Sequence, residues 1–229
     1  MPATVLPRLF ITGTDTHVGK TYVAAGLVRA ARAAGLDCVG FKPICCGDRD
    51  DADLLHAASD SALPLNEVNP VWFRAPAAPY AASMIENRQP DLALIEETFH
   101  RLCARHQSVI VEGAGGWRVP ITRELAFSDL AARWNLPVLV VAANRLGALN
   151  HTLLTIESIQ RAGLSSLAVI LNESSPPDPE TAPATATNAA ILESLLQVPV
   201  FALGYNAPLT ESAFAHWLLK NSAPAVPEG

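Results

Sequence analysis

A glycine-rich segment near the start of the sequence has the residue types of a phosphate-binding loop. It consists of nine consecutive residues: Gly13, Thr14, Asp15, Thr16, His17, Val18, Gly19, Lys20 and Thr21. Glycines let a backbone curl so that several N–H groups point at one anion, and a following helix presents its positive end. In such a loop Lys20 reaches the β- and γ-phosphates of a nucleotide, and the Thr21 hydroxyl holds Mg²⁺. The segment therefore predicts a nucleotide-binding site.

The spacing of the two glycines departs from the standard pattern. Gly13 lies six residues before Gly19, and Thr14 occupies the position five residues before it. A surface turn that happens to contain Gly-Lys-Thr is the alternative. The flanks favour the phosphate loop, because an apolar run at 9–11 predicts the preceding strand and residues 23–34 have the pattern of the following helix.

A second glycine-rich segment follows the apolar run 108–111. It consists of Glu112, Gly113, Ala114, Gly115 and Gly116. This order places a carboxylate at the end of a buried strand and then lets the backbone approach a ligand closely. Glu112 is therefore a candidate ligand of Mg²⁺, directly or through a second shell. A plain turn with an exposed glutamate is the alternative.

Lys42 follows another predicted strand, at 37–41, and should lie at the same sheet edge as Lys20. Two ammonium groups there cost electrostatic energy unless anions lie between them, as in a phosphoryl-transfer site. Lysine is scarce, since only three of the 16 cationic residues are lysines, namely Lys20, Lys42 and Lys220. A surface lysine is the alternative. The acidic segment 48–53 reads as a solvated loop that starts a helix, or as the source of one more oxygen ligand for Mg²⁺.

Short apolar runs alternate with longer helical patterns along the chain. Strands are predicted at 9–12, 37–41, 108–111, 137–142, 167–171 and 200–203. Helices are predicted at 18–34, 91–105, 127–134, 148–162 and 187–196. Continuous apolar strands need burial on both faces, so we expect an α/β fold with a mostly parallel central sheet between two helical layers. Ligands bind such folds beyond the carboxyl ends of the strands, where the glycine loop falls.

Length and composition indicate one globular domain. The 229 residues are 50% hydrophobic and 17% charged, which suits a single domain over residues 1–229 with a large core. We expect a loose C-terminal tail at about 221–229. The Pro-rich stretch 174–183 is expected to be a mobile surface loop, with a lid or a dimer contact as the alternative.

Charge and cysteine usage exclude several classes of protein. A net charge of −6 gives no electrostatic reason to expect a nucleic-acid partner. The four cysteines, which include the adjacent pair Cys45 and Cys46, have no C-x-x-C spacing and read as reduced thiols. The sequence has no export signal and no apolar run of about 18 residues, so we expect a cytoplasmic protein with no membrane partner.

Taken together, these motifs resemble those of the dethiobiotin synthetase family, ATP-dependent carboxylases of biotin biosynthesis. The resemblance consists of Gly13-Thr14-Asp15-Thr16 with Val18-Gly19-Lys20-Thr21, Lys42-Pro43, Asp51-Ala52, Val111-Glu112-Gly113-Ala114-Gly115-Gly116, and Leu146-Gly147 with Asn150-His151-Thr152-Leu153. The motifs occur in the family's order from Gly13 to Asn172. The six-residue glycine spacing is itself a feature of that family. The resemblance implies a P-loop NTPase-type three-layer fold.

The resemblance also implies a reaction. The family joins CO₂ to an amine of 7,8-diaminononanoate, phosphorylates the carbamate with ATP, and closes a ureido ring with loss of phosphate. By similarity, Lys20 and Lys42 are the catalytic residues, and Thr21, Asp51 and Glu112 bind Mg²⁺. The implied nucleotide contacts are the loop from Gly13 to Thr21, Asp51, Glu112, Gly113, Ala114, Gly115 and Asn172. Asn172 is expected to read the adenine edge, although turn chemistry is the alternative for an asparagine at a strand end.

The substrate acid is expected to bind at a helix N-terminus. In the family, amides of this segment from a neighbouring subunit hold the carboxylate, which implies a homodimer. The corresponding residues here are Gly147, Ala148, Leu149 and Asn150. They open the predicted helix 148–162, whose free N–H groups attract an anion. Helix capping without a ligand is the alternative.

Several positions depart from the family pattern. Cys46 replaces the usual Ser or Thr before Gly47 and could still face the substrate. His17 replaces a usual Glu in the phosphate loop, Tyr80 replaces a usual His, and the nucleotide segment 204–208 fits poorly. These departures concern substrate contacts and nucleotide choice rather than the class of reaction.

Two rival functions are weaker. A cobyrinate amidotransferase-like ligase of the same superfamily carries an additional glutamine amidotransferase domain, for which 229 residues leave no room. A switch ATPase that resembles ParA or MinD carries an extra lysine early in the loop, whereas residues 13–18 contain none. No basic amphipathic tail for a membrane is present either.

Overall fold

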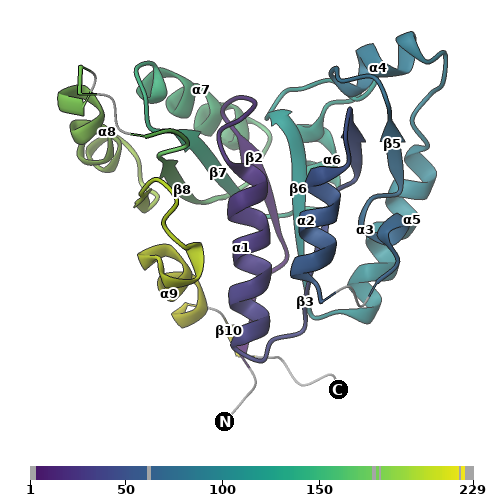
Figure 1. Ribbon diagram of the computed structural model, residues 1–229, viewed down its shortest axis with the longest axis horizontal. Helices are drawn as coiled ribbons and strands as arrows, with labels where there is room; N and C mark the ends of the chain where they lie inside the picture. Colours follow the sequence, from purple (N-terminus) through teal and green to yellow (C-terminus); the bar gives the residue numbers. More distant parts are fainter. Residues whose placement is uncertain (1–3, 61–62, 177–178, 181, 222, 225–229) are drawn as a thin grey trace.

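Six parallel strands form the central sheet, in the order β3-β6-β2-β7-β8-β9 (Figure 1). The computed structural model describes residues 4–60, 63–176, 179–180, 182–221 and 223–224. The strands of this sheet are β2 (Leu9–Gly13), β3 (Cys38–Phe41), β6 (Ser108–Gly116), β7 (Val138–Ala143), β8 (Ser166–Asn172) and β9 (Val200–Leu203). Two short two-stranded sheets pair β4 (Ile44–Cys46) with β5 (Val71–Phe73), and β1 (Thr4–Val5) with β10 (Ala223–Pro224).

Helices cover both faces of the sheet, so the fold has three layers. They are α1 (Lys20–Ala33), α2 (Asp50–Ala58), α3 (Leu65–Val68), α4 (Pro79–Ile85), α5 (Leu92–Arg105), α6 (Phe127–Arg133), α7 (Ala148–Arg161), α8 (Ala182–Leu195), the 3₁₀ turn η1 (Leu209–Glu211) and α9 (Ala213–Lys220). Figure 1 shows α1, α2 and α9 in front of the sheet and α6 and α7 behind it. None of the helices in the described part of the chain has the length and hydropathy needed to cross a bilayer.

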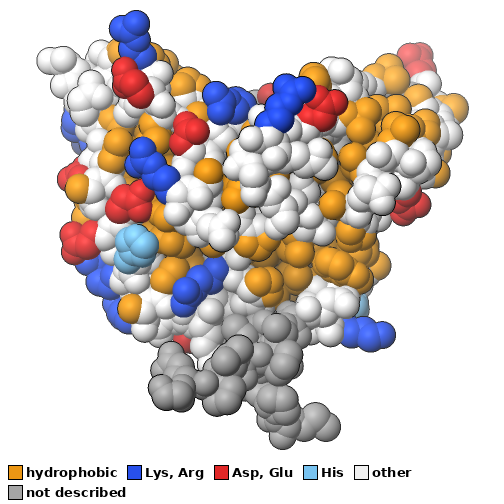
Figure 2. All heavy atoms as spheres, turned by 180° about the vertical axis from the view of Figure 1, so that it is seen from behind, with side chains coloured by type: hydrophobic (Ala, Val, Ile, Leu, Met, Phe, Trp, Pro, Cys, Tyr) orange, Lys and Arg blue, Asp and Glu red, His pale blue; other side chains and the backbone are white. Residues whose placement is uncertain are grey.

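The rear face of the molecule has an uneven distribution of side chains (Figure 2). Charged groups gather on the side of α5, which carries an exposed pair between Arg101 and Glu97. Apolar groups gather on the side of α7, near which Leu146 and Leu154 are more than half exposed.

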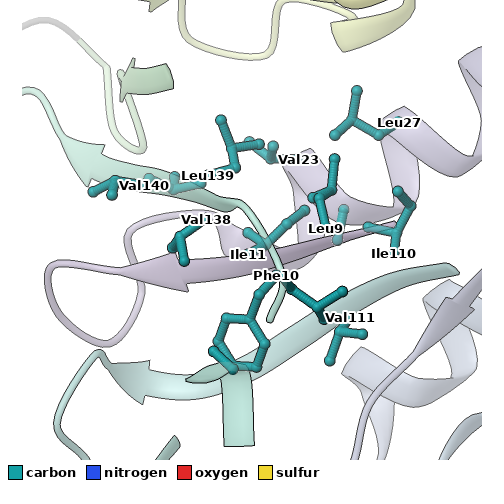
Figure 3. Close-up of a cluster of buried hydrophobic side chains, with 14 of the residues drawn as sticks. Leu9, Phe10, Ile11, Val23, Leu27, Ile110, Val111, Val138, Leu139 and Val140 are labelled. Atoms are coloured by element: carbon teal, nitrogen blue, oxygen red, sulfur yellow. The ribbon is translucent and has the colours of Figure 1, made fainter. Parts of the chain in front are cut away.

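The core lies where the apolar strands meet the first helix. Phe10 of β2 pairs with Val111 of β6 on one side and Val138 of β7 on the other. All five residues of β2 are buried, and Val23 and Leu27 of α1 pack over them (Figure 3). Burial on both faces explains why these strands are apolar without alternation, as the sequence predicts. The loop between β2 and α1 therefore begins at the carboxyl edge of the sheet.

The predicted parallel sheet is confirmed, with four differences in detail. First, β6 continues through Glu112 to Gly116 and does not end at residue 111, because Glu112 pairs with Ile11 inside the ladder. Second, α8 begins at Ala182, inside the predicted loop 174–183, and within that stretch residues 177, 178 and 181 lie outside the described part. Third, the short elements between β3 and β6 were not predicted. Fourth, η1 and α9 were not predicted either.

The predicted loose tail falls partly on paired backbone. Ala223 and Pro224 pair with β1 in an antiparallel ladder. Residue 222 and residues 225–229 of that tail lie outside the described residues. The short β1–β10 ladder links the two ends of the described chain.

Candidate active site

The carboxyl ends of the strands surround a cleft of about 740 Å³. Its wall includes the two lysines and the three oxygen donors that the sequence points to: Lys20, Lys42, Thr21, Asp51 and Glu112. Asn172, Cys46, Ala114 and Gly115 line it as well, together with Thr16, His17 and Gly19 of the glycine loop. Residues more than a hundred positions apart in the sequence thus share one cavity, as parallel strands with a common edge require.

The glycine loop wraps tightly around Lys20. The Lys20 ammonium donates a hydrogen bond to the Asp15 carbonyl, with Nζ 3.0 Å from the oxygen. A Cβ at Gly13 would lie 2.7 Å from that same carbonyl oxygen and 2.9 Å from Nζ. Gly13 is therefore required by close approach, even though it stands one position earlier than the standard spacing. His17 has φ 56°, in the left-handed region, and faces the cleft.

Burial makes the ammonium of Lys20 easier to deprotonate than an ordinary lysine. The side chain is 7% exposed, and desolvation, with repulsion from Lys42, lowers its pKa to about 8. No carboxylate bonds directly to Lys20 Nζ among the hydrogen bonds of the described residues. An incoming phosphate would supply the missing negative charge.

Lys42 lies in a buried cluster with two carboxylates. Its Nζ is 2.6 Å from Glu112 Oε1 and 2.6 Å from Asp51 Oδ2. It also donates to the Gly113 carbonyl at 3.3 Å. Lys42 is 2% exposed and Glu112 is fully buried, so each needs the other's charge inside the protein. The sequence predicts anions between Lys20 and Lys42, and the carboxylates of Asp51 and Glu112 are two of them.

The cluster shifts the protonation of all three groups. Burial opposes the charge of Lys42, but the Glu112 and Asp51 carboxylates outweigh it and raise the pKa of Lys42. Burial likewise opposes the charge of Asp51, yet Lys42 and the Thr21 hydroxyl hold its pKa below the ordinary value. For Glu112 burial prevails and its pKa is raised. In this cluster Lys42 is held in its charged form by the half-exposed Asp51 and the buried Glu112.

Oxygens crowd around the Thr21 hydroxyl in a manner that suits a divalent cation. Thr21 Oγ1 lies 2.7 Å from Asp51 Oδ1 and 2.8 Å from Glu112 Oε1, although the hydroxyl has one proton to donate. Glu112 Oε2 is buried with no hydrogen-bond partner. Among the described residues, no group of three or more His, Cys, Asp or Glu side chains is placed to hold a metal ion. This donor set fits Mg²⁺, which commonly takes one or two carboxylates and completes its shell with phosphate and water.

Asn172 stands at the end of β8 and touches the glycine loop. Its side-chain amide donates to the Val18 carbonyl at 3.0 Å, and the side chain is 5% exposed. A Cβ on Gly19, which has φ 93°, would lie 2.2 Å from Asn172 Nδ2. Asn172 therefore supports the glycine loop as well as lining the cleft, a contact that the sequence did not suggest.

The remaining predicted residues lie outside this cleft. Thr14 and Asp15 line an adjacent hollow of about 460 Å³, beside Leu154 of α7. Gly13, Val18 and Gly113 line neither cavity. The segment Gly147, Ala148, Leu149 and Asn150 begins α7 and also lines neither cavity.

Two departures from the family pattern can be placed. Cys46 lies in β4 at the cleft wall, and burial raises the pKa of its thiol to about 11. Tyr80 follows Pro79 in α4 and is not among the residues that line the cleft, whereas Pro79 is.

Two tyrosines lie at the rim of the cleft: Tyr205, in the segment 204–208 considered above, and Tyr22, which the sequence reasoning missed. Tyr22 and Tyr205 both line the cleft and are 40% and 44% exposed. The Tyr22 hydroxyl donates to the Ala207 carbonyl at 2.6 Å, which ties α1 to the segment 204–208. Tyr22 follows Thr21 directly, but nothing in the sequence indicates that a residue 185 positions later meets it.

Comparisons with known proteins identify the family of this chain. A family model described as an AAA domain matches residues 7–212. The ATP-dependent dethiobiotin synthetase BioD of Akkermansia muciniphila is 45% identical over 193 residues, which cover 84% of this chain and 89% of the relative. That of Anaeromyxobacter dehalogenans strain 2CP-1 is 50% identical over 188 residues, or 80% and 84% of the two chains. The chain belongs to the dethiobiotin synthetase family.

As a dethiobiotin synthetase family member, the protein is an ATP-dependent enzyme of the ligase class. The family resemblance drawn from the sequence is thereby confirmed. Among solved structures, the signal recognition particle receptor FtsY of Elizabethkingia anophelis has a TM-score of 0.52 at 16% identity, covering 93% of this chain and 64% of its own. Chloroplast FtsY of Physcomitrella patens gives 0.51. These likenesses concern the fold alone and confirm the P-loop NTPase type.

Proposed function

We propose that the protein carboxylates 7,8-diaminononanoate with CO₂ and closes the ureido ring to give dethiobiotin, ADP and phosphate. The observation that carries this proposal is the convergence of Lys20, Lys42, Thr21, Asp51 and Glu112 on one cleft, in a chain 45–50% identical to dethiobiotin synthetases. We propose that residues 1–229 act as one ligase domain. Four free cysteines support a cytoplasmic setting.

The reaction has three steps. An amine of the substrate adds to CO₂ and loses a proton, which forms a carbamate. A carbamate oxygen then attacks the γ-phosphorus of ATP and ADP leaves, which forms a mixed carbamic-phosphoric anhydride. The second amine attacks the carbamate carbon, phosphate leaves with the bridging oxygen, and a proton is lost as the ring closes. Each step builds negative charge on oxygens that need nearby cations.

The two lysines divide this charge between them in the proposal. Lys20, enclosed by the glycine loop, meets the phosphates of the anchored nucleotide. Lys42 is kept charged by Asp51 and Glu112 and can meet the carbamate and the transferring phosphoryl group. The low pKa of Lys20, about 8, supports a role in which phosphate supplies its counter-charge.

Thr21, Asp51 and Glu112 would hold Mg²⁺ in the proposed complex. The crowding of their oxygens and the unpartnered Glu112 Oε2 support this assignment. Bound there, Mg²⁺ would neutralise phosphate charge and orient the γ-phosphoryl group. Thr21 itself begins α1 next to Lys20, so the helix fixes both donors with respect to the loop.

Nucleotide and substrate contacts complete the proposal. The loop from Gly13 to Thr21, together with residues 112–115, would surround the phosphates, and Asn172 would face adenine. Cys46 would contact the substrate at the cleft wall. The turn of Gly147, Ala148, Leu149 and Asn150 would hold the substrate carboxylate for a neighbouring subunit, which makes the protein a homodimer. The exposed Leu146 and Leu154 support a partner on this side of α7.

The proposal is tested by incubating the purified protein with diaminononanoate, bicarbonate and MgATP. We expect dethiobiotin and ADP in equal amounts by mass spectrometry, and neither when the diamine is omitted. ATP hydrolysis that proceeds without dethiobiotin would favour a switch ATPase. Amidation of a different acid would favour the related ligase.

A further inference from the structure

An ion pair joins the phosphate loop to the turn that precedes α7. Arg145 Nη2 lies 2.9 Å from Asp15 Oδ2, although 130 residues separate the two in the sequence. The site described above assigns no role to Arg145. Asp15 belongs to the loop that is proposed to bind the nucleotide phosphates. Arg145 stands two residues before Gly147, in the turn that is proposed to bind the substrate carboxylate. The pair therefore connects the two binding segments.

The Asp15 end of the pair controls the position of the phosphate loop. Its carbonyl oxygen accepts the hydrogen bond from Lys20 Nζ, and its Oδ1 accepts from the Thr16 backbone N–H at 2.8 Å. Asp15 thus holds Lys20 through its backbone and Thr16 through its carboxylate. A displacement of Asp15 would move the ammonium and the loop amides together.

The Arg145 end of the pair controls the start of α7. The Arg145 carbonyl accepts from the N–H of Ala148, the first helical residue, at 3.0 Å. Its own N–H donates to the Ala143 carbonyl at 2.9 Å, at the end of β7. Arg145 is therefore anchored to the sheet and to the helix N-terminus by its backbone, and only its side chain is free to reach the loop.

We propose that Arg145 is a positioning residue, which acts through Asp15 to keep Lys20 and the loop amides at a fixed distance from the α7 N-terminus. This inference rests on the function proposed above. In the proposed homodimer it links the nucleotide site of one subunit to the carboxylate-binding turn that the same subunit presents to its partner. The pair would therefore hold the phosphate loop of one site in place against the turn that serves the partner's site, rather than hold the fold together.

The exposure of the pair separates positioning from stability. The side chains of Arg145 and Asp15 are 58% and 48% exposed, and exposed ion pairs contribute little to folding. A loss of activity on removing the pair would consequently not be due to unfolding. Solvent access also means that salt should weaken the pair.

The test is a double-mutant cycle with Arg145→Gln and Asp15→Asn, in which asparagine keeps an acceptor for Thr16. We expect each single variant to lower kcat about tenfold, because small displacements of reacting groups cost rate. The double variant should lose no more than either single variant, since both remove one interaction. Arg145→Lys should recover most of the rate. Arg161→Gln is the matched control, because it removes an exposed pair with Glu157 inside α7 and should keep wild-type activity.

Three results would overturn the inference. The first is a wild-type kcat in Arg145→Gln. The second is a double variant whose kcat falls about a hundredfold, as the product of the two single losses. The third is a fall in the melting temperature of a single variant that accompanies its loss of activity. A wild-type protein that forms no dethiobiotin would instead defeat the proposed function. The same cycle would then be read out as MgATP affinity by calorimetry, where non-additive losses support the positioning role and additive losses overturn it.

Discussion

At the residue scale, Lys42 combines a catalytic position with a structural charge. It is the counter-ion of the fully buried Glu112, so its removal leaves a carboxylate unpaired inside the protein. The sequence alone suggests only that the cleft needs positive charge for phosphoryl transfer. The structure adds that the same charge stabilises the folded state.

We therefore predict two separable effects of Lys42→Met. Product formation should fall at least about a hundredfold, because a group that stabilises transferring charge is lost, while the affinity for MgATP stays within about threefold. The free energy of unfolding should fall by about 3 kcal/mol, since a buried pair is broken. Denaturant titration and steady-state assays measure the two effects.

The double variant Lys42→Met with Glu112→Gln is the control for this separation. It removes the unpaired charge, so stability should be largely recovered while activity stays lost. Recovery of activity together with stability would contradict a direct role of Lys42 in the reaction.

Cys46 allows a pH-dependent prediction at the cleft wall. Burial raises its pKa to about 11, so the protonated thiol dominates at neutral pH and the reactive thiolate is scarce. The alkylation rate of Cys46 by iodoacetamide, followed by peptide mapping with Cys46→Ser as blank, should rise about tenfold per pH unit between pH 8 and 10. A plateau near pH 9, as for a solvated thiol, would show that the side chain is not buried at the wall.

At the scale of elements, the glycine loop depends on a backbone conformation as well as on its side chains. Gly19 has φ 93° and would place a Cβ 2.2 Å from Asn172 Nδ2. Gly35, just beyond α1, has φ 78° with no atom within 4 Å of the corresponding Cβ. An alanine would be strained by the left-handed backbone at both positions, but only at Gly19 would its Cβ also collide with a neighbouring atom.

We predict that Gly19→Ala lowers MgATP affinity at least tenfold, because the loop must move away from Asn172. Gly35→Ala should cost only about 1–2 kcal/mol of stability, the strain of a left-handed alanine, and leave affinity unchanged. Calorimetric titration of both variants checks this. Equal affinities would mean that the contact between Gly19 and Asn172 does not shape the loop.

The sequence predicts the elements that have a strong physical signature. Strands such as β2 and β7 are continuous apolar runs, and parallel strands bring their ends together, so the meeting of Lys42 with Glu112 follows from topology. The three-residue strands β4 and β5 are too short to show a period, and they were missed. Contacts such as that between Asp15 and Arg145 depend on side-chain geometry across 130 residues and carry no sequence signal.

At the scale of the whole molecule, the proposal requires two subunits for one complete site. The α7 N-terminus lines no part of its own chain's cleft, and Leu146, just before α7, and Leu154, within it, are exposed. A dimer in which each α7 serves the other subunit's cleft would account for both observations.

This arrangement predicts complementation between two inactive variants. Lys42→Met disables the cleft, and Asn150→Asp places a negative charge where the substrate carboxylate should bind. Mixed dimers would contain one intact site, so remixing after dissociation should restore about a quarter of wild-type activity. An active dimer that shows no complementation would mean that each cleft uses its own α7.

The central claim is that ATP activates a carbamate, and isotope transfer tests it most directly. Doubly ¹⁸O-labelled CO₂ is supplied with the diamine and MgATP, and the reaction is stopped before the CO₂ exchanges its oxygens with water. The phosphate and dethiobiotin are then analysed by mass spectrometry. We predict one ¹⁸O atom in the phosphate and one in the ureido carbonyl, because the carbamate oxygen that attacks phosphorus leaves with it at ring closure. Dethiobiotin accompanied by unlabelled phosphate, or ADP without dethiobiotin, would contradict the account.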